Sequence, residues 1–246
     1  MKGKDRIFRA EINEPGDFVF DDRVVRVFPD MINRSVPGYA TIVPMLGMLA
    51  RRYAAPGSRL YDLGCSLGAV TLAMQAAAQV PLERIVAVDN SKQMIRQFER
   101  VLAREAAPGG APVELVCGDV MDVSIHDASV VVLNFTLQFI EPGRRLGLLQ
   151  KIAAGLRPGG VLLLSEKVRF EDRTEQELQN EWHHDFKRAQ GYSDLEIARK
   201  RDALENVMVP ETLQAHRQRL SQAGFDRCYR WYQGFNFVSV VAFKDE

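Results

Sequence analysis

Glycines and acidic residues follow short apolar runs in this sequence, at positions where they could bind a nucleoside. The run 59–63 leads into Gly64-Cys65-Ser66-Leu67-Gly68, and its two glycines let the backbone come close to a ligand. Asp62 could hold this turn or receive an ammonium group. The run 84–88 ends at Asp89, whose carboxylate can accept hydrogen bonds from both hydroxyls of a ribose.

Two later apolar runs end in the same way. Gly118-Asp119 follows the run 113–117, and the Asp119 carboxylate could accept from the exocyclic amine of an adenine. Asn134 closes the run 130–134. A glycine turn alone is weak evidence, but the carboxyl ends of parallel strands share one edge of a sheet, so four such ends predict one nucleoside site.

The spacing of the glycines favours S-adenosylmethionine over a dinucleotide. Gly64 and Gly68 lack between them the middle glycine of G-x-G-x-x-G, which lets the backbone approach a pyrophosphate. Asp89 also falls later than the spacing of about 20 residues that is usual in dinucleotide sites. S-adenosylmethionine has no phosphate, so the missing glycine does not count against it.

Alternation of strand-like and amphipathic stretches predicts an α/β, Rossmann-like fold that would present these strand ends. Its sheet should be mainly parallel and seven-stranded, with an antiparallel hairpin at the end. The expected strands are 59–63, 84–88, 113–117, 130–134, 161–165, 228–232 and 237–243. Helices are expected over 40–53, from Gly68, Ser91 and Gly143, and up to about Gly224, with a turn at 156–160 before the fifth strand.

Two segments add to this sheet, and we treat residues 1–246 as a single domain that includes them. Residues 1–55 are expected to form an N-terminal arm and a helix, the arm being irregular up to residue 38. Its aromatic anchors would be Phe8, Phe18, Phe20 and Phe28. Residues 171–206 hold no strand-like run and are rich in charge, His and Gln, which predicts a helical insertion.

Composition narrows the class of partner and the compartment. The chain has 32 Lys and Arg against 32 Asp and Glu, so no overall field attracts a polyanion, and we expect no direct nucleic-acid contact. Three scattered cysteines and the lack of a signal segment indicate the cytoplasm. The apolar runs are far shorter than the roughly 20 residues that cross a bilayer, so we expect no membrane span.

Some conspicuous side chains have a structural explanation as well as a catalytic one. Cys65 has no assigned base beside it and is interpreted as a packing residue. His183 and His184 would point about 100° apart on a helix, which argues against a shared metal and favours structural roles. Tyr39, after Pro-Gly, could be a core aromatic, but covering the ligand is the preferred role. No metal site is predicted.

Five segments together resemble the carboxy-S-adenosyl-L-methionine synthase family. The resemblance covers nearly the whole chain, including the arm and the insertion, which generic methyltransferases do not share. Residues 102–112 and both ends match less well, without touching an expected site residue. The segments are Ser35-Val36-Pro37-Gly38-Tyr39, 61–68, 131–139, His183-His184-Asp185-Phe186-Lys187-Arg188-Ala189 and Leu204-Glu205-Asn206-Val207-Met208.

The resemblance implies a class I methyltransferase fold that carboxylates its own cofactor. S-adenosylmethionine would be a substrate, prephenate the donor of CO2, and carboxy-S-adenosylmethionine and phenylpyruvate the products. A partner enzyme would use the product to carboxymethylate the wobble uridine of tRNA, a functional link without direct nucleic-acid binding. No metal is implied, and the proton acceptor stays open because hydroxide lost from prephenate could serve.

The same resemblance implies the site residues. Those that bind S-adenosylmethionine would be Tyr39, Gly64, Cys65, Ser66, Asp89, Asn90, Asp119, Val120, Asn134 and Arg201. Arg201 would bind the new carboxylate through its planar guanidinium and would reach the site across a homodimer, although the sequence around it also fits a solvated helix face. Arg34 and Arg199 are weaker candidates for holding prephenate.

Two other functions stay open at the level of sequence. An ordinary methyltransferase acting on a small molecule or RNA would explain the glycine turn equally well, although Asn134-Phe135-Thr136-Leu137 lacks the Asn/Asp-Pro-Pro-Tyr pattern of base amino-methylation. A non-catalytic S-adenosylmethionine sensor or partner subunit would also fit the neutral composition. The mass of a co-purifying ligand would separate all three.

Overall fold

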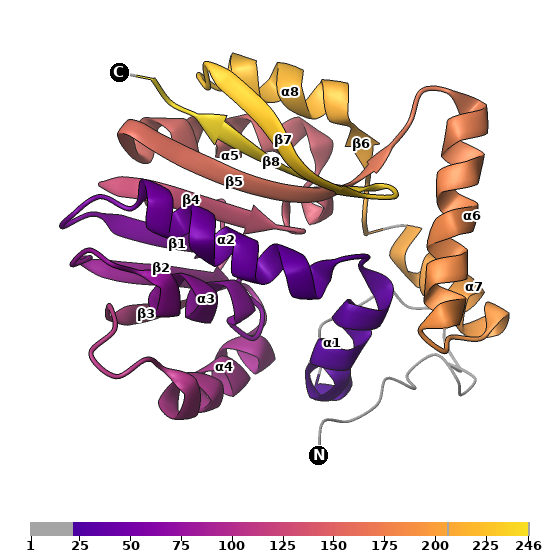
Figure 1. Ribbon diagram of the computed structural model, residues 1–246, viewed down its shortest axis with the longest axis horizontal. Coiled ribbons are helices and arrows are strands. Elements are labelled where there is room, and N and C mark those ends of the chain that lie inside the picture. The colour runs from indigo at the N-terminus through magenta and orange to yellow at the C-terminus, as the bar shows by residue number, and fades with distance from the viewer. Residues whose placement is uncertain (1–21, 206, 246) are drawn as a thin grey trace.

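The computed structural model describes residues 22–205 and 207–245. It is an α/β fold in which helices cover both faces of one sheet (Figure 1). The order of the main strands is β3-β2-β1-β4-β5-β8-β7, as in a doubly wound sheet that reverses its order beside β1. All seven strands predicted from the sequence are thereby confirmed.

The first five strands are parallel, and the last two form the predicted antiparallel hairpin at one edge. β8 pairs antiparallel with both β5 and β7. The strands are β1 (Arg59–Leu63), β2 (Arg84–Asp89), β3 (Val113–Cys117), β4 (Ala128–Asn134), β5 (Leu156–Arg169), β6 (Glu211–Thr212), β7 (Arg227–Gly234) and β8 (Phe237–Phe243). The two-residue β6, which pairs with β5, was not predicted.

Helices on the two faces bury separate apolar clusters against the sheet. On one face, α2 and α3 contribute Ile42, Leu46 and Met74, while α5 and α8 contribute Leu148 and Leu220 on the other. The helices are α1 (Asp22–Ser35), α2 (Tyr39–Tyr53), α3 (Ala69–Ala77), α4 (Lys92–Glu105), α5 (Pro142–Gly155), α6 (Arg173–Ala189), α7 (Asp194–Glu205) and α8 (Leu213–Gln222), with a 3-10 turn η1 (Leu137–Phe139).

The helical insertion is confirmed as α6 and α7, which lie with α1 beyond the carboxyl ends of the parallel strands (Figure 1). The Asp172 side chain caps α6 by accepting from the backbone N–H of Glu175 at 2.7 Å. Within the described ranges, no helix combines the length and apolar character needed to span a bilayer.

The expectation of an irregular arm up to residue 38 is wrong for residues 22–35, which form α1. Val24, Val25, Phe28 and Met31 recur at helical spacing and pack against Met94 of α4, a pattern that the mixed charges around them obscured. Phe28 is thus a helical anchor. The other proposed anchors, Phe8, Phe18 and Phe20, lie outside the described residues.

The turn expected at residues 156–160 is also wrong, because these residues begin β5. Leu156 pairs with Ala128, and the register shifts before the next pair, so the glycine-rich stretch is an irregularity within the strand. Gly159 takes a φ of +74°, and its backbone N–H donates to the Lys244 carbonyl at 3.0 Å. The sheet therefore supplies partners that a free turn would lack.

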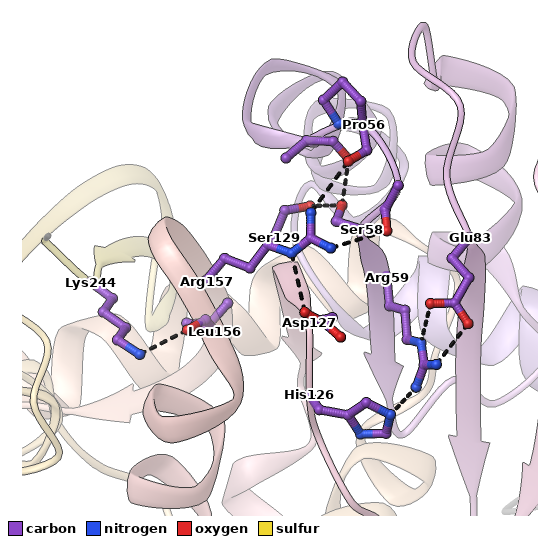
Figure 2. A network of polar contacts seen from close by, with 12 residues as sticks. Pro56, Ser58, Arg59, Glu83, His126, Asp127, Ser129, Leu156, Arg157 and Lys244 are labelled. Atoms are coloured by element: carbon purple, nitrogen blue, oxygen red, sulfur yellow. Dashed lines mark hydrogen bonds and ion pairs between the residues drawn. The ribbon is translucent and has the colours of Figure 1, made fainter.

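A polar network closes the amino ends of β1, β4 and β5, opposite the predicted site (Figure 2). The Arg157 guanidinium donates to the carbonyls of Pro56 and Gly57 at 3.3 and 3.1 Å. Arg59 and Glu83 form an ion pair at 2.6 Å. Exposed pairs of this kind contribute less than about 1 kcal/mol each, so the network mainly neutralises this edge.

Candidate functional site

A cavity of about 390 Å³ opens at the carboxyl ends of the parallel strands, a size that suits a nucleoside-type ligand. Its lining comes from β1, β2, β4, β5, α1, α6 and α7 and from the loops after the strands. The predicted site residues that it brings together are Tyr39, Gly64, Cys65, Ser66, Asp89, Asn90, Asp119, Val120 and Asn134. Arg201 is not among the lining residues.

The glycine turn after β1 depends on the lack of a side chain. Gly64 has a φ of +85°, and a Cβ there would overlap the side chain of Thr136. Gly68, the residue before α3, has a φ of +82°, and a Cβ there would overlap the ring of Phe98 in α4. The chain therefore needs glycine at both positions to form this wall of the cavity.

Asp89 is oriented by the backbone on either side of it. Its Oδ2 accepts from the Ser66 N–H at 2.9 Å, and its Oδ1 accepts from the Ser91 N–H at 2.9 Å. Each oxygen keeps a further lone pair for a ligand hydroxyl. Burial raises the pKa of Asp89, and the two backbone hydrogen bonds oppose that shift.

Asp62 is buried at the base of the cavity, with an exposed fraction of 1%. Its Oδ2 accepts from the Thr71 hydroxyl at 2.6 Å, which fixes one oxygen and leaves the carboxyl facing the cavity. Burial raises its pKa to about 6. A ligand ammonium group beside it would stabilise the ionised form, in line with the predicted role.

The other predicted polar residues also keep capacity for a ligand. Asp119 is exposed, and its Oδ1 accepts from the Met121 N–H at 2.8 Å. The buried Oδ1 of Asn134 has no hydrogen-bond partner in the described part of the chain. An unpaired buried carbonyl is destabilising by about 1–3 kcal/mol, and this atom is available to accept a hydrogen bond from a ligand.

Tyr39 is positioned by the turn before α2. Gly38 takes a φ of +77°, and the Tyr232 hydroxyl of β7 donates to the Pro37 carbonyl at 3.0 Å. The Tyr39 ring lies with its centroid 6.5 Å from that of Phe135. Burial, with the negative charge of Asp62, raises the Tyr39 pKa, so the hydroxyl stays protonated and can donate to a ligand.

The structural interpretations of Cys65 and His183 fit their surroundings. Burial raises the pKa of the Cys65 thiol, which disfavours the nucleophilic thiolate. His183 is buried, and its Nε2 lies 2.8 Å from the Ser35 carbonyl, where the neutral ring donates. Burial lowers the His183 pKa to about 2. His183 nevertheless lines the cavity, which the sequence did not indicate.

The predicted arginines lie outside the cavity of their own chain. Arg201 is more than half exposed and pairs with Asp202 at 3.0 Å. Arg34 is buried, donates to the Gln190 carbonyl at 2.8 Å and stacks on Tyr192, so it joins α1 to the loop after α6. Neither Arg34 nor Arg199 lines the cavity. The cavity therefore does not support Arg34 or Arg199 as residues that hold prephenate.

Three lysines that the sequence reading did not select line the cavity instead: Lys167, Lys187 and Lys200. Lys187 and Lys200 are buried, and Lys167 is half-buried. Burial and the neighbouring positive charges of Lys167 and Lys200 lower the Lys187 pKa to about 7. The only sequence signal was indirect, since Lys187 falls within a segment chosen for its resemblance and Lys200 precedes Arg201.

Comparison with known structures identifies the fold. A model of the methyltransferase domain matches residues 60–160. A putative O-methyltransferase from Nostoc punctiforme superposes with a TM-score of 0.63 at 15% identity, covering 90% of this chain and 59% of that one. Human N-acetylserotonin methyltransferase in complex with SAM superposes with a TM-score of 0.61 at 18% sequence identity. The match covers 91% of this chain and 55% of that one. The chain has the class I methyltransferase fold.

Curated relatives narrow this class. A carboxy-S-adenosyl-L-methionine synthase from Citrifermentans bemidjiense is 58% identical over 240 residues, 98% of both chains. One from Klebsiella pneumoniae is 52% identical over 244 residues, 99% of this chain and 98% of that one. The chain belongs to the carboxy-S-adenosyl-L-methionine synthase family and is a transferase.

Proposed function

We propose that the chain converts S-adenosyl-L-methionine and prephenate to carboxy-S-adenosyl-L-methionine and phenylpyruvate. The observation that carries the proposal is the cavity itself. Carboxylates at one end, Asp62, Asp89 and Asp119, suit a nucleoside and an ammonium group, while cationic side chains from β5, α6 and α7 suit an anionic second substrate. An ordinary methyl acceptor has no general need for such cations.

S-adenosylmethionine enters as a substrate, and the predicted polar residues of the cavity have matching roles. Asp89 accepts from the ribose hydroxyls, Asp119 from the adenine amine, and Asp62 or Asn134 from the amino group of the methionine part. Tyr39 covers the ligand from the start of α2. Cys65, Ser66, Asn90 and Val120 complete the walls through backbone and packing contacts.

The reaction balances without a protein nucleophile. The bond from the prephenate ring to its carboxylate breaks, its electron pair enters the ring, and the ring hydroxyl leaves as hydroxide, which gives phenylpyruvate and CO2. Hydroxide takes a proton from the sulfonium methyl group and becomes water. The remaining carbon lone pair forms the new bond to CO2. The protein holds these groups together and excludes bulk water.

Arg201 has its proposed role across a homodimer. It is exposed on α7 and does not line the cavity of its own chain, and in the cavity of a second subunit its planar guanidinium would bind the new carboxylate. The product would then serve a separate enzyme that carboxymethylates the tRNA wobble uridine. The balanced net charge gives this chain itself no general affinity for nucleic acid.

The mass of the ligand that co-purifies with the protein tests this proposal. We expect a species heavier than S-adenosylmethionine by one CO2, or its formation once prephenate is added. Recovery of unmodified S-adenosylmethionine, with no heavier product after prephenate is added, would instead favour a methyltransferase or a non-catalytic sensor.

A further inference from the structure

The structure brings three ammonium groups together on one side of the cavity. Lys167 lies on β5, Lys187 on α6 and Lys200 on α7, and all three line the same space. His183 lines the same cavity, and its ring packs edge-on against Phe237 with ring centroids 4.9 Å apart. These three elements follow one another along the chain, and their packing brings the three side chains to one cavity; we name this cluster the lysine wall.

Lys167 lies near Asn134, to which the proposed function assigns the methionine part of S-adenosylmethionine. Asn134 of β4 pairs with Ser165 of β5, and Lys167 is two residues further along β5. Residues two apart on a strand share a face and are separated by about 7 Å, so Lys167 and Asn134 line the same side of the sheet. The lysine wall therefore begins beside Asn134, on the same side of the sheet.

Two of these charges have no counter-ion among the described residues. In the ranges 22–205 and 207–245, neither Lys167 Nζ nor Lys187 Nζ makes a hydrogen bond or ion pair. Glu166 adjoins Lys167 in sequence but points to the opposite face of the strand, where it accepts from the Leu137 N–H at 3.0 Å. An enclosed cation without a partner is destabilising, so an anion from outside is its natural complement.

Lys200 completes the wall and is held in position. Its Nζ donates to the Ser35 hydroxyl at 2.6 Å and lies 5.2 Å from the centre of the Tyr192 ring. Fixing the ammonium in this way lowers the entropy lost when a ligand binds. The wall thus combines one anchored cation with two that have no partner in the described part of the chain.

We propose that Lys167, Lys187 and Lys200 bind the carboxylate of the second substrate that is retained in phenylpyruvate. This inference rests on the proposed function. Prephenate carries two carboxylates, one on its ring and one on its pyruvyl side chain. The ring carboxylate loses its charge as it departs as CO2, so strong ion pairs to it would stabilise the ground state more than the transition state and slow the reaction.

The pyruvyl carboxylate keeps its charge throughout. Ion pairs to it hold the substrate through the transition state without opposing bond cleavage, and the burial of Lys187 and Lys200 strengthens them by lowering the local dielectric constant. The ring carboxylate is then free to face the sulfonium group. The lysine wall therefore selects an anionic donor and fixes its orientation in one set of contacts.

Lys187→Met and Lys167→Met test the assignment, with Arg188→Met as a control. Arg188 is the next residue on α6, is half exposed and does not line the cavity, so its variant matches the loss of charge. For each lysine variant we expect the KM for prephenate and the inhibition constant of phenylpyruvate to rise at least about tenfold. The Kd for S-adenosylmethionine should stay within about twofold of the wild-type value.

The outcomes separate this inference from the proposed function. If the KM for prephenate and the inhibition constant of phenylpyruvate are unchanged in both folded variants, the lysine assignment is wrong. It is also wrong if only the binding of S-adenosylmethionine is weakened, because the lysines would then bind the methionine carboxylate. If wild-type protein forms no product from prephenate, the proposed donor is wrong. Lys187-dependent binding of phenylpyruvate would then still support a carboxylate site, and its absence would overturn it.

Discussion

The Lys200 ammonium donates a hydrogen bond to the Ser35 hydroxyl at 2.6 Å and so joins α7 to the end of α1. His183 of α6 contacts the carbonyl of the same serine at 2.8 Å. Ser35 precedes the turn that positions Tyr39, so the two segments that extend the methyltransferase fold meet at one residue of the site. We infer that arm and insertion form one wall of the cavity.

Gly64→Ala is expected to weaken S-adenosylmethionine binding about tenfold or more and to lower the free energy of unfolding by about 1–3 kcal/mol. The added methyl group would overlap Thr136 in a backbone conformation with φ of +85°. Gly57→Ala is the control, because Gly57 also has a positive φ but open space around it. Calorimetric titration and urea unfolding measure both effects, and equal Kd values for the two variants would contradict the close-approach argument.

Asp89→Asn is expected to raise the Kd for S-adenosylmethionine by about 10- to 100-fold, since a hydrogen bond to a charged group contributes about 1.5–3 kcal/mol. The amide would also turn an N–H group toward the backbone donor of Ser66 or Ser91. The matched variant Asp122→Asn alters an exposed carboxylate that does not line the cavity. Titration calorimetry should find that the Kd of Asp122→Asn for S-adenosylmethionine is unchanged. A similar loss of affinity in both variants would argue against a specific contact between Asp89 and the ribose.

Lys187→Met is expected to stabilise the ligand-free protein by about 1–4 kcal/mol at neutral pH, because it removes a buried charge without a partner. The folded-state pKa of about 7 lies below the ordinary 10.5, so wild-type stability is lost as pH falls from about 10.5 to about 7. The advantage of the variant should therefore be largest below pH 7 and shrink above it. Urea unfolding across this range measures it, and a destabilised variant at pH 6 would indicate a structural lysine.

Arg201→Ala and Asp89→Asn should complement each other if Arg201 acts across a dimer. With S-adenosylmethionine held well below the Kd of Asp89→Asn, each variant alone is expected to have little activity. An equal mixture exchanged into heterodimers should recover about a quarter of wild-type activity, since half the dimers are mixed and each has one intact site. Arg188→Met mixed with Asp89→Asn serves as the control for dilution. An inactive mixture after verified subunit exchange would place Arg201 in its own subunit.

Much of the fold followed from local patterns. The strand ends at Asp62, Asp89 and Asn134 were predictable because parallel strands direct their carboxyl ends to one edge, and the structure brings them into one cavity. Helix α1 was missed because mixed charge obscured its apolar spacing. The stretch at 156–160 was misread because its partners, Ala128 and Lys244, are remote in sequence.

The lysine wall illustrates what sequence patterns cannot provide. Lys167, Lys187 and Lys200 are separated along the chain, and each alone resembles a solvated surface charge. Their burial and shared cavity arise only when α6 and α7 pack against the ends of β5 and α1. Arg34, by contrast, looked available for a substrate but is engaged with Gln190 and Tyr192.

The most direct test of the account follows a labelled carbon. Wild-type protein is incubated with S-adenosylmethionine and prephenate carrying carbon-13 in the ring carboxylate, and the products are analysed by mass spectrometry. The account predicts carboxy-S-adenosylmethionine with the label in its new carboxyl group, together with unlabelled phenylpyruvate. Formation of phenylpyruvate with unmodified S-adenosylmethionine, or of a carboxylated product without the label, would contradict it.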